Sequence, residues 1–156
     1  MSDQPPASIS LDQLGIPHRV FYHLGQVRSL EQAAQERGQR VEQIVRSILF
    51  RLSENEHLMV LVAGPDQISW KKLRKHIGQS RLSMASEDEV LTVTGYRIGT
   101  VSPFGLPRPV KILIDESVLK NDEISIGSGM RNTGIIMKVS DLRRALHDAE
   151  IVSLIE

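Results

Sequence analysis

Hydrophobic and polar residues alternate along the chain with a period that changes from one segment to the next. Where apolar residues recur every three or four positions between a capping residue and a glycine, the pattern predicts a helix. The segment Ser29–Arg37 is the clearest case, because Gln32 stands at capping-box spacing from Ser29 and Gly38 follows. The helices predicted in this way span residues 11–14, 29–37, 41–45, 70–77, 87–92 and 140–146.

Short runs rich in β-branched residues, separated by polar turns, predict the strands. Ile48–Leu52 and His57–Ala63 flank a polar turn and predict a hairpin, whose second strand is almost entirely apolar and therefore central in its sheet. The other predicted strands span residues 19–22, 110–114, 123–126 and 135–139. Strands and helices alternate without strict β-α-β order, so we predict a mixed α/β fold.

Length and composition favour one domain over residues 1–156, with residues 1–8 flexible. A chain of 156 residues with 40% hydrophobic content is long enough to bury one core. Nineteen basic and nineteen acidic residues give a formal net charge of zero, so any RNA contact requires a local patch. The helix with Lys71, Lys72, Arg74 and Lys75 is the candidate patch, and an ordinary solvated helix face is the alternative.

Several classes of site are excluded or disfavoured by composition. The chain has no cysteine, which excludes disulfides, thiolate catalysis and cysteine-based zinc sites. Its five histidines lack zinc-ligand spacing, so we expect no metal, no cofactor and no catalytic histidine. The first residues lack the apolar core of a signal peptide, and no later run is long enough to span a bilayer. We therefore expect a cytoplasmic protein without a membrane partner.

The segment Gly99–Gly105 has the composition of a tight, rigid loop that could bind an anion through its amides. Glycines let the backbone approach a ligand closely, and Pro103 fixes the path of the chain. An ordinary connecting loop is the alternative. Ser102 is not the nucleophile of a hydrolase elbow, because that motif needs glycines where Thr100 and Phe104 stand.

The segment Gly127–Asn132 follows a predicted strand and begins like a dinucleotide-binding loop. The third glycine of that motif is absent, and another β-rich run follows in place of a helix, so we reject the dinucleotide site. A glycine-rich hairpin with Arg131 beside it could still bind a phosphate or ribose edge through its amides. An ordinary glycine hairpin is the alternative interpretation.

Arg46 stands at the junction of a predicted helix and a predicted strand. If the strand begins there, Arg46 shares one face with Ile48 and Phe50, which is the face expected to be buried. A cation in that position needs an anionic or carbonyl-rich partner, such as a ligand pocket supplies. A side chain that turns out to solvent is the alternative.

Three segments together resemble the YbaK/ProX family of aminoacyl-tRNA deacylases, which also occurs as the editing insertion of bacterial prolyl-tRNA synthetases. Ser29–Val45 is similar to the paired helices before the family's lysine, and Gly95–Gly105 to its GxxxP loop, with Gly99 and Pro103 at the defining positions. Ile124–Arg131 is similar to the later glycine-rich turn. The resemblance implies a largely antiparallel, barrel-like central sheet with surrounding helices.

The resemblance also implies a function and a site. It implies a trans-editing deacylase that needs no metal, binds the terminal adenosine and small aminoacyl group of a mischarged tRNA, and has an aminoacyl-tRNA synthetase as a further partner. It implies catalytic roles for Arg46, in the place of the family's lysine, and for Gly99, with both residues and Gly129 lining one pocket. The substrate-binding residues that it implies are Thr100, Val101, Ser102, Pro103, Gly127, Ser128, Gly129 and Arg131.

The arginine at position 46 departs from the family pattern and leaves two hypotheses. Arginine is planar, always charged and unable to act as a general base, so it does not replace a lysine conservatively. If the task of the lysine is electrostatic, Arg46 can perform it and the protein is an editing hydrolase. The alternative is a catalytically weak module that binds tRNA or another nucleotide-like ligand.

Overall fold

The computed structural model describes residues 3–156 and forms two sheets with helices around them. The α-helices are α1 (Pro6–Gln13), α2 (Leu30–Arg37), α3 (Trp70–Ile77), α4 (Glu87–Thr94) and α5 (Val139–Ala145), with 3-10 turns at η1 (Val41–Gln43) and η2 (Glu116–Lys120). The strands are β1 (Arg19–Tyr22), β2 (Val45–Ser53), β3 (Glu56–Ala63), β4 (Ser83–Met84), β5 (Lys111–Asp115), β6 (Glu123–Ile126), β7 (Thr133–Lys138) and β8 (Glu150–Val152).

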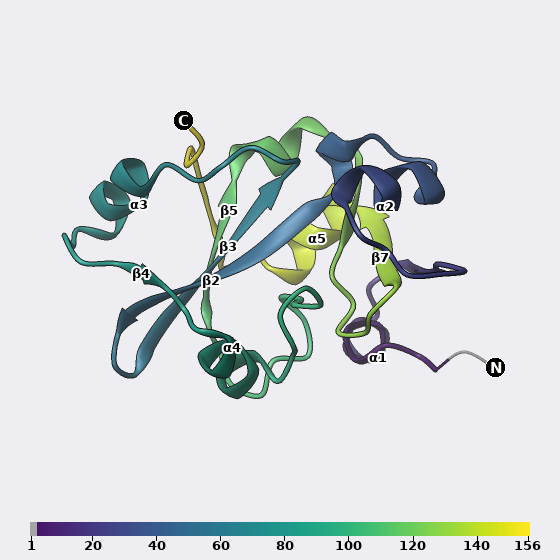
Figure 1. The fold of residues 1–156 in the computed structure, drawn as a ribbon, viewed down its shortest axis with the longest axis horizontal. Helices are drawn as coiled ribbons and strands as arrows, with labels where there is room; N and C mark the ends of the chain where they lie inside the picture. The colour runs from purple at the N-terminus through teal and green to yellow at the C-terminus, as the bar shows by residue number, and fades with distance from the viewer. Residues whose placement is uncertain (1–2) are drawn as a thin grey trace.

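The larger sheet has the strand order β4-β2-β3-β5-β8, and the smaller has the order β1-β7-β6. The smaller sheet is antiparallel throughout, whereas β5 lies parallel to both β3 and β8. In Figure 1, α3 and α4 lie on either side of the β2-β3 hairpin, and α2 lies with β7 at the other end of the molecule. A parallel bridge between Ile44 and Ser125 joins the two sheets where β2 begins.

The β2-β3 hairpin forms where the sequence predicts it, and β3 is the central strand because its residues are almost all apolar. Five of its residues, Leu58 to Val62, are completely buried. Alternation along β2 sends odd-numbered residues such as Leu49 into the core between the sheets and even-numbered ones such as Phe50 into a second core. Leu73 of α3 completes that second core.

The mixed α/β class is confirmed, but the barrel-like sheet is not. In residues 3–156 the strands form two open sheets, because β7 pairs with β1 on one side and β6 on the other in a separate sheet instead of continuing the larger one. The single domain over residues 1–156 stays a prediction.

The first helix begins at Pro6, earlier than the predicted start at Leu11. Ala7 and Ser8 are buried and Ala7 N–H donates to Ser128 O at 3.1 Å, so residues 6–8 are part of the fold where a flexible segment was expected. Residues 1–2 lie outside the described part. Pro6 suits the first turn of a helix, where its missing N–H costs no hydrogen bond.

Other boundaries differ where tertiary pairing overrides local propensity. The helix predicted at 41–45 is a 3-10 turn that ends at Gln43, because Ile44 bridges to Ser125 and Val45 already pairs with Ala63. Helix α5 begins at Val139 after an uncapped Lys138, so Ser140 lies inside the helix and does not cap the helix predicted over residues 140–146. The short strands β4 and β8 were not predicted.

Candidate functional site

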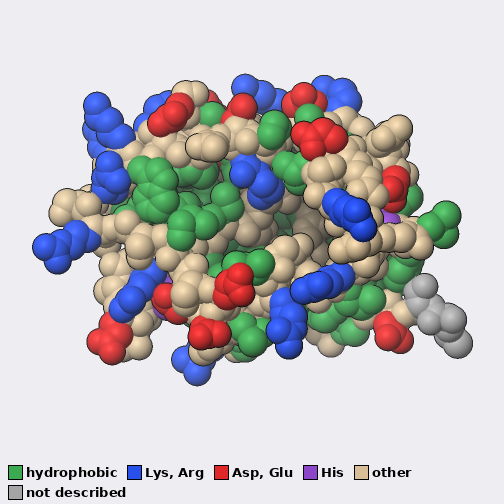
Figure 2. Space-filling view, in the orientation of Figure 1, with side chains coloured by type: hydrophobic (Ala, Val, Ile, Leu, Met, Phe, Trp, Pro, Cys, Tyr) green, Lys and Arg blue, Asp and Glu red, His purple; other side chains and the backbone are tan. Residues whose placement is uncertain are grey.

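A cavity of about 360 Å³ opens where the two sheets meet, within the range of about 300–1,000 Å³ typical of small-molecule sites. Its walls come from α2, the first half of β2, the loop after α4 and the start of the glycine-rich turn after β6. Most of the wall is apolar, as at Leu30, Leu49 and Ile126. Figure 2 shows a hollow near the middle of this face, with lysine and arginine side chains around its rim.

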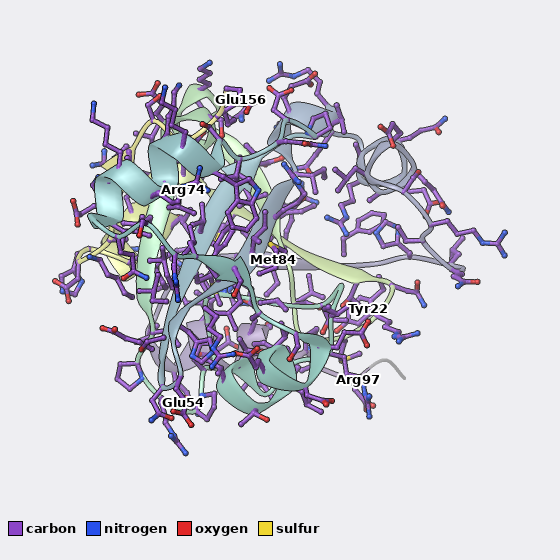
Figure 3. All side chains as sticks on the ribbon, turned by 60° about the vertical axis from the view of Figure 1, so that its left-hand side comes forward. Tyr22, Glu54, Arg74, Met84, Arg97 and Glu156 are labelled. Carbon is purple, nitrogen blue, oxygen red and sulfur yellow. The ribbon has the colours of Figure 1, made fainter. Side chains whose placement is uncertain are left out.

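Two exposed apolar side chains stand at this cavity. Met84 is 54% exposed and Ile98 is 50% exposed, and both contribute to the cavity wall. Figure 3 shows Met84, on the edge strand β4 of the larger sheet, between α3 and α4. Exposed apolar side chains beside a cavity favour contact with a flat or apolar part of a ligand.

The loop after α4 is held in a fixed conformation. Tyr96 is buried and its hydroxyl donates a hydrogen bond to Phe104 O across the loop, while burial raises the pKa of Tyr96 to about 12. Gly99 has a φ of 88°, a left-handed conformation that glycine adopts without steric cost. Thr100 N–H and Oγ1 both donate to Arg97 O, at 3.0 and 2.8 Å. The loop is therefore built as a preformed turn.

The two glycine-rich segments touch each other directly. A Cβ on Gly127 would lie 2.0 Å from Val101 O, and Gly129 N–H donates to Thr100 O at 2.9 Å. Within residues 3–156, no backbone hydrogen bond engages the N–H groups of Gly99, Val101 and Gly127. Backbone donors of this kind at a cavity wall can stabilise negative charge that develops on a bound carbonyl oxygen.

Arg46 belongs to the cavity wall, on the predicted strand face with Ile48 and Phe50. Its guanidinium, however, donates to the backbone carbonyls of the loop after β3, from Nε to Gly64 O at 2.8 Å and from Nη2 to Asp66 O. Partial burial holds the pKa of Arg46 below its usual value. The carbonyl-rich partner expected for Arg46 is therefore this loop.

The predicted site residues divide into three groups. Arg46, Gly99, Val101 and Gly127 line the cavity. Gly99 also lines an adjoining cavity, together with Thr100 and Arg131. The remaining four residues line neither cavity: they are Ser102, Pro103, Ser128 and Gly129.

The expectation that Gly129 lines the pocket with Arg46 and Gly99 is wrong. A Cβ on Gly129 would lie 2.6 Å from a ring carbon of Tyr96, so Gly129 packs against the inside of the loop. Ser102 and Ser128 are fully buried, and their hydroxyls accept hydrogen bonds from Phe104 N–H and Met130 N–H. These residues do not line the cavity and instead hold the loop after α4 and the turn after β6 in position.

The polar residues of the cavity that the sequence analysis did not predict are Ser29, Arg37, Ser47 and Thr133. Ser47 lines it beside Val45 and Leu49, and its buried hydroxyl has no hydrogen-bond partner among residues 3–156. Arg37, the last residue of α2, lines both cavities. An arginine in the last turn of a helix is an ordinary capping signal, so the sequence gives no sign that Arg37 belongs to a site.

The other expectations concerned a metal site, a membrane span and the basic helix α3. In residues 3–156, no three His, Cys, Asp or Glu side chains are grouped so that they could hold a metal ion. No helix of the described chain is long and apolar enough to cross a bilayer. The basic residues of α3 line neither cavity, and Lys72 Nζ donates to Ile155 O at 2.6 Å. A contact between α3 and RNA stays a prediction.

The fold and the cavity define a mixed α/β protein with a largely apolar cavity of small-molecule size where its two sheets meet. Residues 25–145 match the family described as the aminoacyl-tRNA editing domain, and the chain belongs to that family.

Named relatives support this assignment. The chain is 30% identical over 138 residues to the multifunctional Ser/Thr-tRNA deacylase ProXp-y of Escherichia coli, covering 86% of this chain and 82% of that one. It is 31% identical over 114 residues to the proline–tRNA ligase of Thermosipho melanesiensis. The matched region covers 73% of this chain but only 20% of the ligase. A crystal structure described provisionally as a trans-editing enzyme for prolyl-tRNA synthetase superposes with a TM-score of 0.90 at 29% identity, covering 99% of both chains.

Proposed function

We propose that this protein is a trans-editing deacylase that hydrolyses the ester between a wrongly attached amino acid and its tRNA. The observation that carries the proposal is the cavity between β2 and the two glycine-rich segments, in a chain that belongs to the aminoacyl-tRNA editing family. Its relatives include a protein named as a Ser/Thr-tRNA deacylase. The alternative of a catalytically weak binding module gains no support from these comparisons.

In the proposed reaction, water adds to the ester carbonyl and the bond to the ribose oxygen breaks, which gives a free amino acid and tRNA with its hydroxyl restored. Negative charge develops on the carbonyl oxygen during this addition. Gly99, Val101 and Gly127 line the cavity, and their N–H groups, which no backbone acceptor of residues 3–156 engages, can donate to that oxygen. One such donor contributes about a hundredfold or more to the rate in other acyl-transfer sites.

The substrate fits the cavity by its chemistry. The apolar walls suit a small aminoacyl group. Met84 and Ile98, exposed beside the cavity, suit a face of the terminal adenine. The adjoining cavity, with Thr100 and Arg131, gives room for the rest of the tRNA end.

Arg46 acts in this proposal through charge and position. Its guanidinium is bonded to the backbone carbonyls of Gly64 and Asp66, so it stays fixed beside the cavity that Arg46 lines and contributes a positive field to it. A role of this kind does not need the general base that an arginine cannot provide. The partners proposed are aminoacyl-tRNA and an aminoacyl-tRNA synthetase, and the proposed location is the cytoplasm.

The test is deacylation of a panel of misacylated tRNAs by the wild type, Arg46→Lys and Arg46→Ala. The wild type should hydrolyse at least one misacylated tRNA faster than the spontaneous rate. Arg46→Ala should reduce that rate, and Arg46→Lys should retain more of it, because lysine keeps the charge. A folded wild type that hydrolyses none of the panel would contradict the proposed function.

A further inference from the structure

We propose that Arg37 binds the phosphate that links the terminal adenosine of the tRNA to the preceding nucleotide. This inference rests on the proposed function, because it names the part of the tRNA that crosses from the first cavity to the adjoining one. Arg37 contributes to the walls of both cavities. The inference adds a binding residue that neither the sequence motifs nor the glycine-rich loops supply.

The guanidinium of Arg37 is fixed by groups from three distant parts of the chain. Nε donates to His23 Nε2 at 3.0 Å, and Nη1 donates to Ser125 Oγ at 2.8 Å. The guanidinium also lies against the backbone of Gly134, where an added Cβ would be 2.4 Å from Cζ and 2.6 Å from Nη2. Nη2 donates no hydrogen bond to residues 3–156, so it is available to a ligand.

His23 supports this position through its tautomer. Its Nδ1 lies 2.7 Å from Glu36 Oε1, and its Nε2 accepts from Arg37, so the ring hydrogen is on Nδ1 and is donated to Glu36. Glu36 Oε2 accepts a further bond from Gln32 at 2.9 Å. The carboxylate nearest in sequence to Arg37 is thus bonded to a neutral imidazole and an amide.

The positive charge of Arg37 therefore lacks a direct counter-ion. Among residues 3–156, no carboxylate oxygen lies within 4.0 Å of its guanidinium nitrogens. Burial lowers the pKa of Arg37, with the charge of Glu36 opposing that effect. A partly buried cation whose partners are neutral is stabilised by an anion that brings its own charge.

The position of Arg37 between the cavities selects a phosphate as that anion. The two cavities share Val27, Ile98, Gly99 and Thr133 with Arg37, so they meet along this line. An RNA end whose aminoacyl group lies in the first cavity must pass this line to leave through the second. The planar guanidinium matches phosphate geometry, and Arg131 in the second cavity adds charge of the same sign.

The test compares two stable amide analogues of an aminoacyl-adenosine that differ only in a methyl phosphate on the 5′ oxygen. For the wild type, the analogue with the phosphate should bind about ten to a hundred times more tightly. In Arg37→Gln this advantage should disappear, while the phosphate-free analogue should bind as it does to the wild type. For a single-stranded RNA that ends in the same analogue, the slope of log affinity against log salt concentration should be smaller in magnitude by about 0.7 in Arg37→Gln than in the wild type.

Two further variants separate binding from folding. Gly134→Ala keeps the charge but displaces the guanidinium, so it should also reduce the advantage of the phosphate. Arg19→Gln is the matched control, because Arg19 is exposed, pairs with Glu123 and lines neither cavity, and it should leave both affinities unchanged.

The outcomes distinguish the two proposals. Wild-type binding of both analogues without a phosphate advantage, or an advantage that persists in Arg37→Gln, overturns the role of Arg37 alone. Equal weakening of both analogues in Arg37→Gln also overturns it, because a structural role would have that effect. A wild type that binds neither analogue contradicts the proposed function and the role of Arg37 with it.

Discussion

Gly127 shows how the absence of one side chain joins the two glycine-rich segments at the cavity. Its backbone lies so close to Val101 that a Cβ would be 2.0 Å from Val101 O and 3.1 Å from Thr100 O. Both neighbours are backbone atoms, which cannot move aside as the end of a flexible side chain can. The approach therefore fixes the distance between the loop after α4 and the turn after β6.

Replacing Gly127 with alanine should separate these segments and lower stability. We expect a loss of about 1–3 kcal/mol in the free energy of unfolding, as for other overpacked sites, and slower deacylation. Gly25→Ala is the control, since no heavy atom lies within 4 Å of a Cβ built there. Denaturant titration measures both changes, and equal stability of Gly127→Ala and wild type would show that the close approach is not required.

The residues of the site differ in how well the sequence predicts them. Gly99 and Gly127 were predictable because a glycine a few residues before a proline, or at the end of a strand, marks a tight turn by local chemistry. The face of Arg46 was predictable from strand alternation, but its partners Gly64 and Asp66 were not. Arg37 was not predictable at all, because its setting depends on tertiary contacts.

Helix α4 brings the loop with Gly99 to the cavity, and its first turn is closed by a capping box. Ser86 Oγ accepts from Glu89 N–H at 3.2 Å, and the Glu89 carboxylate accepts from Ser86 N–H at 3.2 Å. Gly95 ends the helix with a φ of 78°. These bonds satisfy donors that a helix start otherwise leaves unpaired.

Loss of this cap should destabilise the protein, whereas loss of a similar serine elsewhere should not. Ser86→Ala should lower the free energy of unfolding by about 1 kcal/mol. Ser140→Ala is the matched control, because Ser140 is an exposed residue inside α5 and does not cap it. Thermal unfolding of both variants tests this difference, and equal losses would contradict the assigned role of Ser86.

Elements with local signals were predictable, and elements made by long-range pairing were not. The helices that follow Ser29, Ser69 and Ser86 were predictable because the hydroxyl of each serine bonds within the first turn of its own helix. Strand β8 exists through its pairing with β5, more than thirty residues earlier, as Leu113 pairs with Glu150. Such pairing leaves little trace in the local pattern of three residues.

At the scale of the whole molecule, hydrogen-bonded carboxylates make stability depend on pH. The pKa of Glu89 is lowered, chiefly by its hydrogen bond with His57, and that of Glu36 chiefly by its hydrogen bond with Gln32. As pH falls below 4.5, the ordinary pKa of a glutamate, the unfolded chain therefore binds more protons than the folded protein. The stability that these two carboxylates contribute is present above that pH and is lost as pH falls through their lowered pKa values.

Glu89→Gln should make the protein less sensitive to acid. The variant has no carboxylate to protonate at this position, so its stability should fall less than that of the wild type between pH 7 and pH 3, a window that spans about the ordinary range of carboxyl pKa values. Glu54→Gln, in the exposed hairpin turn, is the control and should follow the wild type. Parallel curves for Glu89→Gln and wild type would contradict the linkage.

The two sheets meet at the cavity, and the central claim is that the cavity binds the aminoacylated end of a tRNA. Nuclear magnetic resonance titration with a stable aminoacyl-adenosine analogue tests this claim most directly. The amide signals of Gly99, Val101 and Gly127 should shift with a common affinity, while those of Lys71 and Lys75 on α3 should not. Saturable shifts confined to α3 or to β8, with the cavity signals unchanged, would contradict the account.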